Sequence, residues 1–210
     1  MKNLFALSIL AASVAMTACS KKPEETTPAT GAAATTASAS GATIIKIGHA
    51  APLTGPQAHL GKDNENGVRL AVDELNAKGL TIGGQKVQFE LHSEDDQADP
   101  RIATTVAQKF VDDKVNVMIG HLNSGTTIPA SRIYNDAGIV EVSPSATNPK
   151  YTQQGYKGAF RVMANDVQQG KVLGEFAVND MAAKKIAIID DRSAYGQGLA
   201  DEFEKAAKAA

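Results

Sequence analysis

The stretch VNVMIGHLNSGTTIPA, residues 115–130, decides the fold. It begins with the apolar run Val115 to Gly120, which is typical of a strand buried on both faces of a parallel sheet. Small polar residues follow from Gly120 to Thr127, and the pattern then predicts a helix around Ile128 to Ala137. A strand, a short loop and a helix in this order form the repeating unit of α/β proteins.

The same unit precedes this stretch. A short apolar strand is predicted at Ile44 to His49, with a Pro-Gly-rich turn after it at residues 52–56. The next helix is indicated by an apolar stripe and by a glycine suited to a left-handed C-cap. The stripe is Val68, Ala71, Val72 and Leu75, and the glycine is Gly79.

A second unit lies between that helix and residue 115. Apolar and polar residues alternate over residues 86–92, which is the period of a strand covered on one face. Asp99 and Pro100 then form the start of a helix, with an N-cap residue followed by proline in the first turn. Its inner face is expected at Ile102, Val106 and Phe110.

Alternation continues to the last residue. Further strands are predicted at Ile139–Val142, Phe160–Met163 and Ile186–Ile189, and further helices at Gly170–Met181 and from about Leu199. Because crossovers between parallel strands are right-handed, this order predicts an α/β fold with a doubly wound parallel sheet and helices on both of its faces.

The first 19 residues carry a different signal. Lys2, the apolar stretch Leu4 to Met16 and the small residues before Cys19 are typical of a secretory signal peptide. Cys19 is the only cysteine, and its position resembles the lipobox at which bacterial lipoproteins are cleaved and acylated. We expect a lipid anchor at Cys19, although an ordinary signal peptide that contains a cysteine remains an alternative.

Residues 20–43 are dominated by Ala, Thr, Ser, Gly and Pro, a composition that cannot form a core. We expect a disordered tether between the anchor and the folded part. The formal net charge of the whole chain is −2, with scattered Lys and Arg, which argues against nucleic acid as a partner.

The loops after the strands are the places to look for a site, since ligands of open parallel sheets bind beyond the carboxyl ends of the strands. The loop at residues 120–127 leads into a helix, so its backbone N–H groups and the Ser124 hydroxyl suit a carboxylate. Alternatively, Ser124 or Thr126 only caps that helix. The loop at residues 143–149 also offers hydroxyls, or is a simple turn.

The sequence gives little support for a catalytic role. No cysteine remains for a thiolate nucleophile, and the four histidines lack metal-ligand spacing. The acidic stretches Glu94-Asp95-Asp96 and Asp190-Asp191 could bind a cation or act as bases, but acidic residues at strand ends are commonly solvated, and we expect that here. No glycine-rich phosphate loop is present, so no nucleotide cofactor and no metal is expected.

Specific strings identify a family resemblance, and they share the order and spacing of the Leu/Ile/Val-binding proteins. They include Pro52-Leu53-Thr54-Gly55-Pro56, Asp99-Pro100, Gly120-His121-Leu122, Ser143-Pro144-Ser145-Ala146-Thr147-Asn148-Pro149, Arg161, Asp166 and Tyr195-Gly196-Gln197-Gly198. The resemblance implies a type I periplasmic-binding fold, in which two lobes close on an amino acid. It places the first lobe at residues 44–165 and the beginning of the second at 166–210.

The resemblance also implies site residues. Ser124 and Thr147 would hold the carboxylate and ammonium groups, helped by the backbone of Ser145. Tyr195 would close over the ligand from the second lobe. Leu60 would touch the ligand side chain, at a position where family members often carry an aromatic residue.

Two departures from the family pattern stand out. Some members bridge the loops after the second and third strands with cysteines, at the places held here by Ala98 and Asn123. The family also continues well beyond Ala210, where it supplies an acidic ammonium ligand. We therefore expect the 210-residue chain alone to bind leucine, isoleucine or valine no tighter than about millimolar.

The resemblance implies the substrate-binding component of an ABC importer, periplasmic or otherwise extracytoplasmic, which delivers branched-chain or related amino acids to a membrane permease. The alternative is a ligand-sensing module of the same fold that binds amides, urea or another small polar solute. An enzyme on a doubly wound sheet would need a base, a nucleophile or a cofactor loop that the sequence does not offer.

Overall fold

The computed structural model describes residues 41–210. The predicted signal peptide, Cys19 and almost all of the predicted tether lie outside the described residues. Within the described range, no helix is both long enough and apolar enough to cross a membrane.

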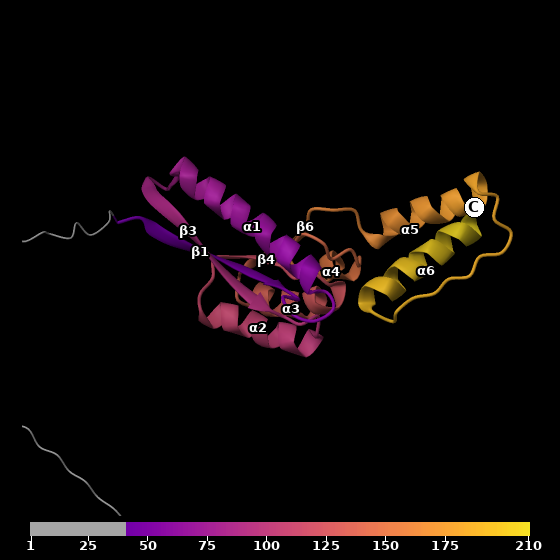
Figure 1. Cartoon of the computed structure of the whole chain (residues 1–210), viewed down its shortest axis with the longest axis horizontal. Coiled ribbons are helices and arrows are strands. Elements are labelled where there is room, and N and C mark those ends of the chain that lie inside the picture. Colours follow the sequence, from indigo (N-terminus) through magenta and orange to yellow (C-terminus); the bar gives the residue numbers. More distant parts are fainter. Residues whose placement is uncertain (1–40) are drawn as a thin grey trace, which may run out of the picture. The chain divides into compact units, whose positions relative to one another are not determined.

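Six strands form one sheet, in the order β2-β3-β1-β4-β5-β6 (Figure 1). The strands are β1 (Thr43–Ala51), β2 (Thr81–Ile82), β3 (Gln85–Asp95), β4 (Val117–Gly120), β5 (Val140–Ser143) and β6 (Ala159–Arg161). All neighbouring pairs are parallel except β2 and β3. The predicted doubly wound parallel sheet is therefore confirmed, with a short antiparallel strand added at one edge.

That edge strand was not predicted. Gly83 and Gly84 connect β2 to β3 with φ values of 57° and 81°. A two-residue hairpin turn with positive φ at both positions matches the right-handed twist of the flanking strands, and glycine adopts it without steric cost. Two residues of strand are too short to show a periodic pattern in the sequence.

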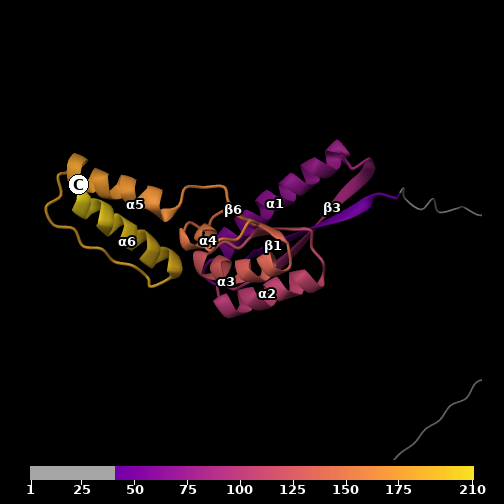
Figure 2. The same ribbon diagram turned by 180° about the vertical axis from the view of Figure 1, so that it is seen from behind.

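Helices cover both faces of the sheet, with α1 on one side and α2 and α3 on the other (Figures 1 and 2). The helices are α1 (Ala58–Lys78), α2 (Pro100–Asp112), α3 (Ser124–Asp136), α4 (Lys150–Gln153), α5 (Asp166–Glu175), the π-helical turn η1 (Phe176–Asp180) and α6 (Ala194–Ala209). The main core fills the side of α2 and α3. It includes Val106, Phe110, Met118, Ala130 and Tyr134, all buried.

The two predicted helix ends have the expected geometry. Asp99 accepts hydrogen bonds from the backbone N–H groups of Arg101 at 2.7 Å and Ile102 at 3.4 Å, so it caps α2. Gly79 ends α1 in the left-handed region, with φ 61°. Local capping chemistry was thus sufficient to place these boundaries.

Three helices begin earlier than predicted. One is α5, which begins at Asp166 and not near Gly170. The helix expected from about Leu199 begins at Ala194, where the Ser193 hydroxyl accepts a bond from the Gly196 N–H at 2.9 Å. Likewise, α3 begins at Ser124 and not near Ile128. The first turns of α3 and α6 carry too few apolar residues to show a helical stripe in the sequence.

The predicted strand at Ile186–Ile189 is wrong for this structure, since these residues form no strand. Ile188 is 41% exposed and Ile189 93% exposed. No strand of residues 41–210 lies beside this segment to pair with its N–H and C=O groups, and extended backbone becomes a strand only through such pairing.

Helices α5 and α6 pack closely on one another, because glycines lie between them. A Cβ atom on Gly170 would come within 2.7 Å of the Glu202 backbone, and one on Gly174 within 2.7 Å of the Ala207 nitrogen.

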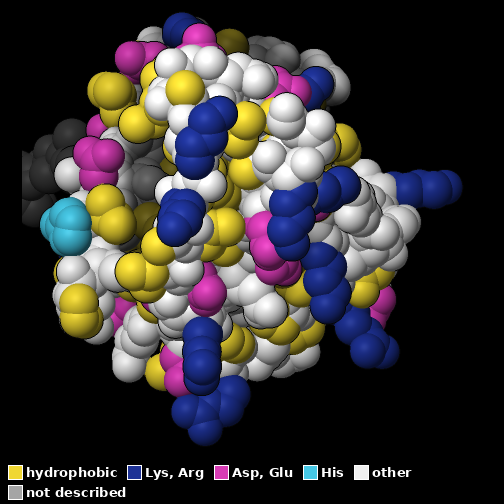
Figure 3. Space-filling model, turned by 90° about the vertical axis from the view of Figure 1, so that its right-hand side faces the viewer, with side chains coloured by type: hydrophobic (Ala, Val, Ile, Leu, Met, Phe, Trp, Pro, Cys, Tyr) yellow, Lys and Arg dark blue, Asp and Glu magenta, His cyan; other side chains and the backbone are white. Residues whose placement is uncertain are grey.

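The side of the molecule shown in Figure 3 carries hydrophobic side chains intermixed with charged ones of both signs. Among the exposed apolar residues are Val172 and Phe176, at 52% and 51%.

Candidate ligand-binding site

Ser124 lies at the first position of α3, directly beyond the carboxyl end of β4, and is 1% exposed. Its hydroxyl oxygen accepts a hydrogen bond from the backbone N–H of Asn148 at 3.2 Å. This bond joins the two predicted ligand loops, which are 24 residues apart in the sequence. The loops at residues 120–127 and 143–149 therefore meet at one edge of the sheet.

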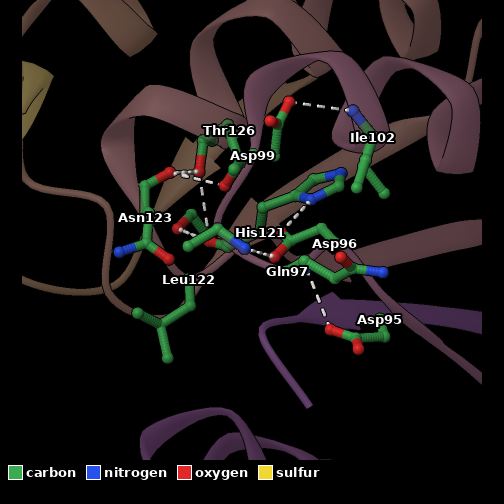
Figure 4. Close-up of polar contacts among 12 residues, drawn as sticks. Asp95, Asp96, Gln97, Asp99, Ile102, His121, Leu122, Asn123 and Thr126 are labelled. Atoms are coloured by element: carbon green, nitrogen blue, oxygen red, sulfur yellow. Dashed lines mark hydrogen bonds and ion pairs between the residues drawn. The ribbon is translucent and has the colours of Figure 1, made fainter. Parts of the chain in front are cut away.

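The alternative that Ser124 or Thr126 merely caps α3 is wrong. The N-cap residue is Asn123, whose side chain makes no capping bond. Thr126 Oγ1 donates to the Asn123 carbonyl at 2.9 Å, which is not a capping contact (Figure 4). The N-terminus of α3 thus has no side-chain cap, and its partial positive charge is free to act on an anion.

Two serine hydroxyls of the loop at residues 143–149 form hydrogen bonds that stabilise the conformation of the loop itself. Ser143 Oγ donates to the His121 carbonyl at 2.8 Å and accepts from the Ala146 N–H at 2.9 Å. Ser145 Oγ donates to the Leu122 carbonyl at 2.9 Å. The interpretation as a turn built by serine therefore holds for these two residues, and it leaves only the backbone of Ser145 for a ligand.

Thr147 differs from its neighbours. The residue is 8% exposed, and its hydroxyl has no hydrogen-bond partner. A buried hydroxyl without a partner is unfavourable by about 1 to 3 kcal/mol. Such a group in a loop beyond a parallel strand is available to a ligand.

Asp166 is the functional candidate that sequence reasoning missed as a ligand. Its backbone N–H donates to the Thr147 carbonyl at 3.0 Å, so it adjoins the ligand loop. Its side chain is fully buried, neither carboxyl oxygen has a partner, and burial raises its pKa above the usual value. An acidic residue in the first turn of a helix is ordinary, so the sequence alone did not single it out.

Another buried polar cluster lies behind the loop at residues 120–127. His121 Nδ1 contacts Asp96 Oδ2 at 2.7 Å (Figure 4). Its Nε2 contacts the Tyr134 hydroxyl at 3.1 Å. All three residues are 0% exposed. This cluster fixes the end of β4 against α3 and the end of β3.

Of the acidic residues predicted as solvated strand ends, Asp190 and Asp191 are exposed, whereas Asp95 and Asp96 are used within the fold. Asp95 accepts from the Leu53 N–H at 2.7 Å and from the Gln97 N–H at 2.9 Å, and Asp96 accepts from the Ala98 N–H at 3.0 Å. Over residues 41–210, no group of three or more His, Cys, Asp or Glu side chains has the geometry of a metal site.

His49 is also buried, in the middle of β1, and neither ring nitrogen has a partner. Burial lowers the pKa of His49 to about 4, against a smaller opposing effect of Glu65. The neutral imidazole is therefore the form that the fold accommodates at neutral pH.

The other two predicted contacts are partly exposed. Leu60 lies in the first turn of α1, beyond the carboxyl end of β1, and is 45% exposed. Tyr195 is 43% exposed and lines a hollow of about 400 Å³ with Leu173, Ile188 and Phe203. The adjacent Ala194 carbonyl accepts from the Asn148 side chain at 2.6 Å, which ties the start of α6 to the ligand loop.

A lobe with parallel strands, hydroxyl-bearing loops beyond their carboxyl ends and an uncapped helix N-terminus is typical of proteins that bind a small anionic or zwitterionic solute. The family comparison agrees. The profile of the periplasmic binding protein family matches residues 44–210, so the chain belongs to that family.

Relatives with curated descriptions share this character. Leu/Ile/Val-binding protein homolog 1 of Brucella abortus is 45% identical over 161 residues, which cover 77% of this chain and 43% of that protein. The leucine-, isoleucine-, valine-, threonine-, and alanine-binding protein of Pseudomonas aeruginosa is 39% identical over 164 residues. The chain thus spans less than half the length of the curated relatives it matches. The predicted resemblance to the Leu/Ile/Val-binding proteins is confirmed.

Solved structures lead to the same class. The branched-chain amino acid transporter substrate binding protein LivJ of Streptococcus pneumoniae, solved with isoleucine, has a TM-score of 0.71 and 32% identity, covering 78% of this chain and 47% of that one. The leucine binding protein LivK of Thermotoga maritima also has a TM-score of 0.71, with 28% identity and coverage of 79% and 46%. These relatives are solute-binding proteins and not enzymes.

Proposed function

We propose that this protein is the extracytoplasmic substrate-binding component of an ABC importer, and that it binds branched-chain or related small amino acids and delivers them to a membrane permease. The curated relatives and the two solved neighbours support the ligand class. The predicted lobes, 44–165 and 166–210, and the lipid anchor at Cys19 belong to the same proposal.

One observation carries the proposal: a buried hydroxyl and a buried carboxylate, both available to a ligand, lie next to each other. The Thr147 hydroxyl and the Asp166 carboxylate are both buried without partners, and the Asp166 N–H bonds to the Thr147 carbonyl. Ser124 and the uncapped N-terminus of α3 are linked to the same loop through Asn148.

The charges favour a zwitterion over an uncharged solute. The helix N-terminus stabilises a carboxylate, and Asp166 would stabilise an ammonium. Burial of the Asp166 carboxylate is costly, and the Thr147 hydroxyl and the Arg161 charge oppose only part of that effect, so a ligand ammonium would offset more of it. Urea or an amide would supply hydrogen bonds and no charge, so the sensing alternative with a neutral solute is the weaker proposal.

Asp166→Asn tests this assignment directly. Asn keeps the shape of the side chain and removes its charge, so affinity for leucine should fall while affinity for 4-methylpentanoate, which lacks the ammonium, should not. The matched control is Asp136→Asn, since Asp136 is 64% exposed on α3. Titrations followed by NMR, in this chain and in a chimera that carries the second half of the Brucella homologue after Ala210, measure both ligands.

Two results would contradict the proposal. One is a D166N variant that distinguishes leucine from 4-methylpentanoate as well as the unmodified protein does. The other is a protein that binds urea or acetamide with higher affinity than any amino acid.

A further inference from the structure

Arg161 is the last residue of β6, and its side chain contacts the loop that carries Thr147. Its Nη1 donates to the Ala146 carbonyl at 2.7 Å, and its Nη2 donates to the Asn148 carbonyl at 2.9 Å. These two carbonyls flank Thr147 on either side. The carbonyl between them, that of Thr147 itself, accepts from the Asp166 N–H at 3.0 Å.

We propose that Arg161 is a positioning residue. It holds the Thr147 loop in its ligand-binding conformation by donating hydrogen bonds to the backbone carbonyls on both sides of Thr147. This inference rests on the proposed function, because it gives that loop a ligand to bind. Arg161 itself would not touch the ligand, since its Nη1 and Nη2 groups already donate to the loop carbonyls.

The geometry suits arginine and no other side chain. A guanidinium is a rigid planar fork with several donors, so it can bind two carbonyls at once with little loss of entropy. Nη2 also donates to the Thr152 hydroxyl at 2.9 Å, and the guanidinium carbon lies 5.3 Å from the centre of the Tyr151 ring. Tyr151 is fully buried and thus a fixed surface for the guanidinium to lie against.

A positioning residue is needed because the loop is held in a shape that is unfavourable by itself. The Thr147 hydroxyl is buried without a partner. A free loop would shift to give this hydroxyl a partner or expose it to water. Bonds from Arg161 to the flanking carbonyls oppose that shift, so the site is ready before the ligand arrives, which improves affinity.

The position of Arg161 adds a second consequence. Only residues 162–165 separate it from Asp166, and both residues bond to consecutive carbonyls of the ligand loop. This short connection joins the sheet to α5. Movement of α5 against the sheet would therefore pull directly on the backbone around Thr147.

Arg161→Gln and Arg161→Lys test the inference, with Arg132→Gln as the matched control. Arg132 is 76% exposed, and its contact with Asp136 is 3.7 Å long. We expect leucine affinity to fall on the order of tenfold or more in R161Q and less in R161K, because lysine keeps the charge but cannot form the fork. R132Q should bind as the unmodified protein does.

A second readout does not depend on leucine. In the ligand-free chain, R161Q should shift the backbone amide resonances of Ala146, Thr147 and Asn148 and speed hydrogen exchange of the Asn148 N–H, which bonds to Ser124. R161K should show smaller changes at the same residues. If R161Q fails to fold, R161K carries both measurements.

Unchanged loop resonances in R161K and R161Q would overturn the inference, as would unchanged leucine affinity in a variant whose loop resonances have moved. Failure of the unmodified protein and the chimera to bind leucine would instead remove the proposed function. The ligand-free resonances then still decide whether Arg161 fixes the loop.

Discussion

Glu141 offers the sharpest test of the electrostatics of the fold. It lies in β5, is 1% exposed, and neither of its carboxyl oxygens has a hydrogen-bond partner. Tyr151 donates to its backbone carbonyl at 3.1 Å. Burial raises the pKa of Glu141 well above its usual value of 4.5, so the folded protein holds this carboxyl in its neutral form.

The consequence for stability has a definite sign. Above pH 4.5 the unfolded chain loses the Glu141 proton while the folded chain keeps it, so the free energy of unfolding falls as pH rises. One proton of difference corresponds to a slope of about 1.4 kcal/mol per pH unit. This contribution is fully present below pH 4.5 and is lost as pH rises toward the pKa of the folded state.

His49 acts in the opposite direction over a lower range. Its pKa falls from 6.5 to about 4, so stability rises with pH between these values and is lost as pH falls through them. Glu141 and His49 therefore oppose each other between about pH 4.5 and 6.5. His49 is present in both E141Q and the unmodified protein, so its contribution cancels in their difference, which is measured upward from about pH 4.5.

Glu141→Gln removes the titrating group and keeps its size. Urea unfolding followed by circular dichroism should show that the variant gains stability relative to the unmodified protein as pH rises, with a difference in slope that approaches 1.4 kcal/mol per pH unit. Glu90→Gln is the control, because Glu90 is 48% exposed. A difference between E141Q and the unmodified protein that stays constant over the whole range above pH 4.5 would refute the reasoning.

Three further predictions concern the anchor, the site and the core. Cys19→Ala should move the protein from the membrane fraction to the soluble exported fraction. In the unmodified protein, mass spectrometry should find an N-terminus at an acylated Cys19. Ser124→Ala and Thr147→Ala should each weaken leucine binding by about 1.5 to 3 kcal/mol in calorimetry of the chimera, and unchanged affinity in both would exclude them as ligands. His121→Ala leaves buried Asp96 Oδ2 without its His121 partner and should lower the free energy of unfolding by about 1 to 3 kcal/mol in urea. An unchanged free energy of unfolding would show that the cluster does not hold the loop.

Much of the fold was predictable because its signals are local and periodic. The apolar run before Gly120, the cap at Asp99 and the C-cap at Gly79 each place an element from a few adjacent residues. The segment Ile186–Ile189 failed for the opposite reason. Its apolar residues look like a strand, but a strand depends on neighbours that the sequence pattern cannot supply.

The candidate site was predictable as a pair of loops and less so as a set of contacts. Strand ends indicate which loops meet, and the bond between Ser124 and Asn148 confirms that the two main ones do. The pattern could not show that the Ser145 hydroxyl donates to the Leu122 carbonyl, or that Asp166 is buried without a partner. Both depend on contacts between residues more than 15 positions apart in the sequence.

The most direct test of the central claim is a titration of the isotope-labelled chain with leucine, isoleucine and valine, followed through the backbone amides by NMR. We expect saturable shifts centred on Ser124 and Thr147, at millimolar concentrations or above for the 210-residue chain and at lower concentrations for the chimera. Glutamate and urea should produce no such shifts. Absence of saturable shifts at these two residues with every branched-chain amino acid, in both proteins, would contradict the claim that this site binds them.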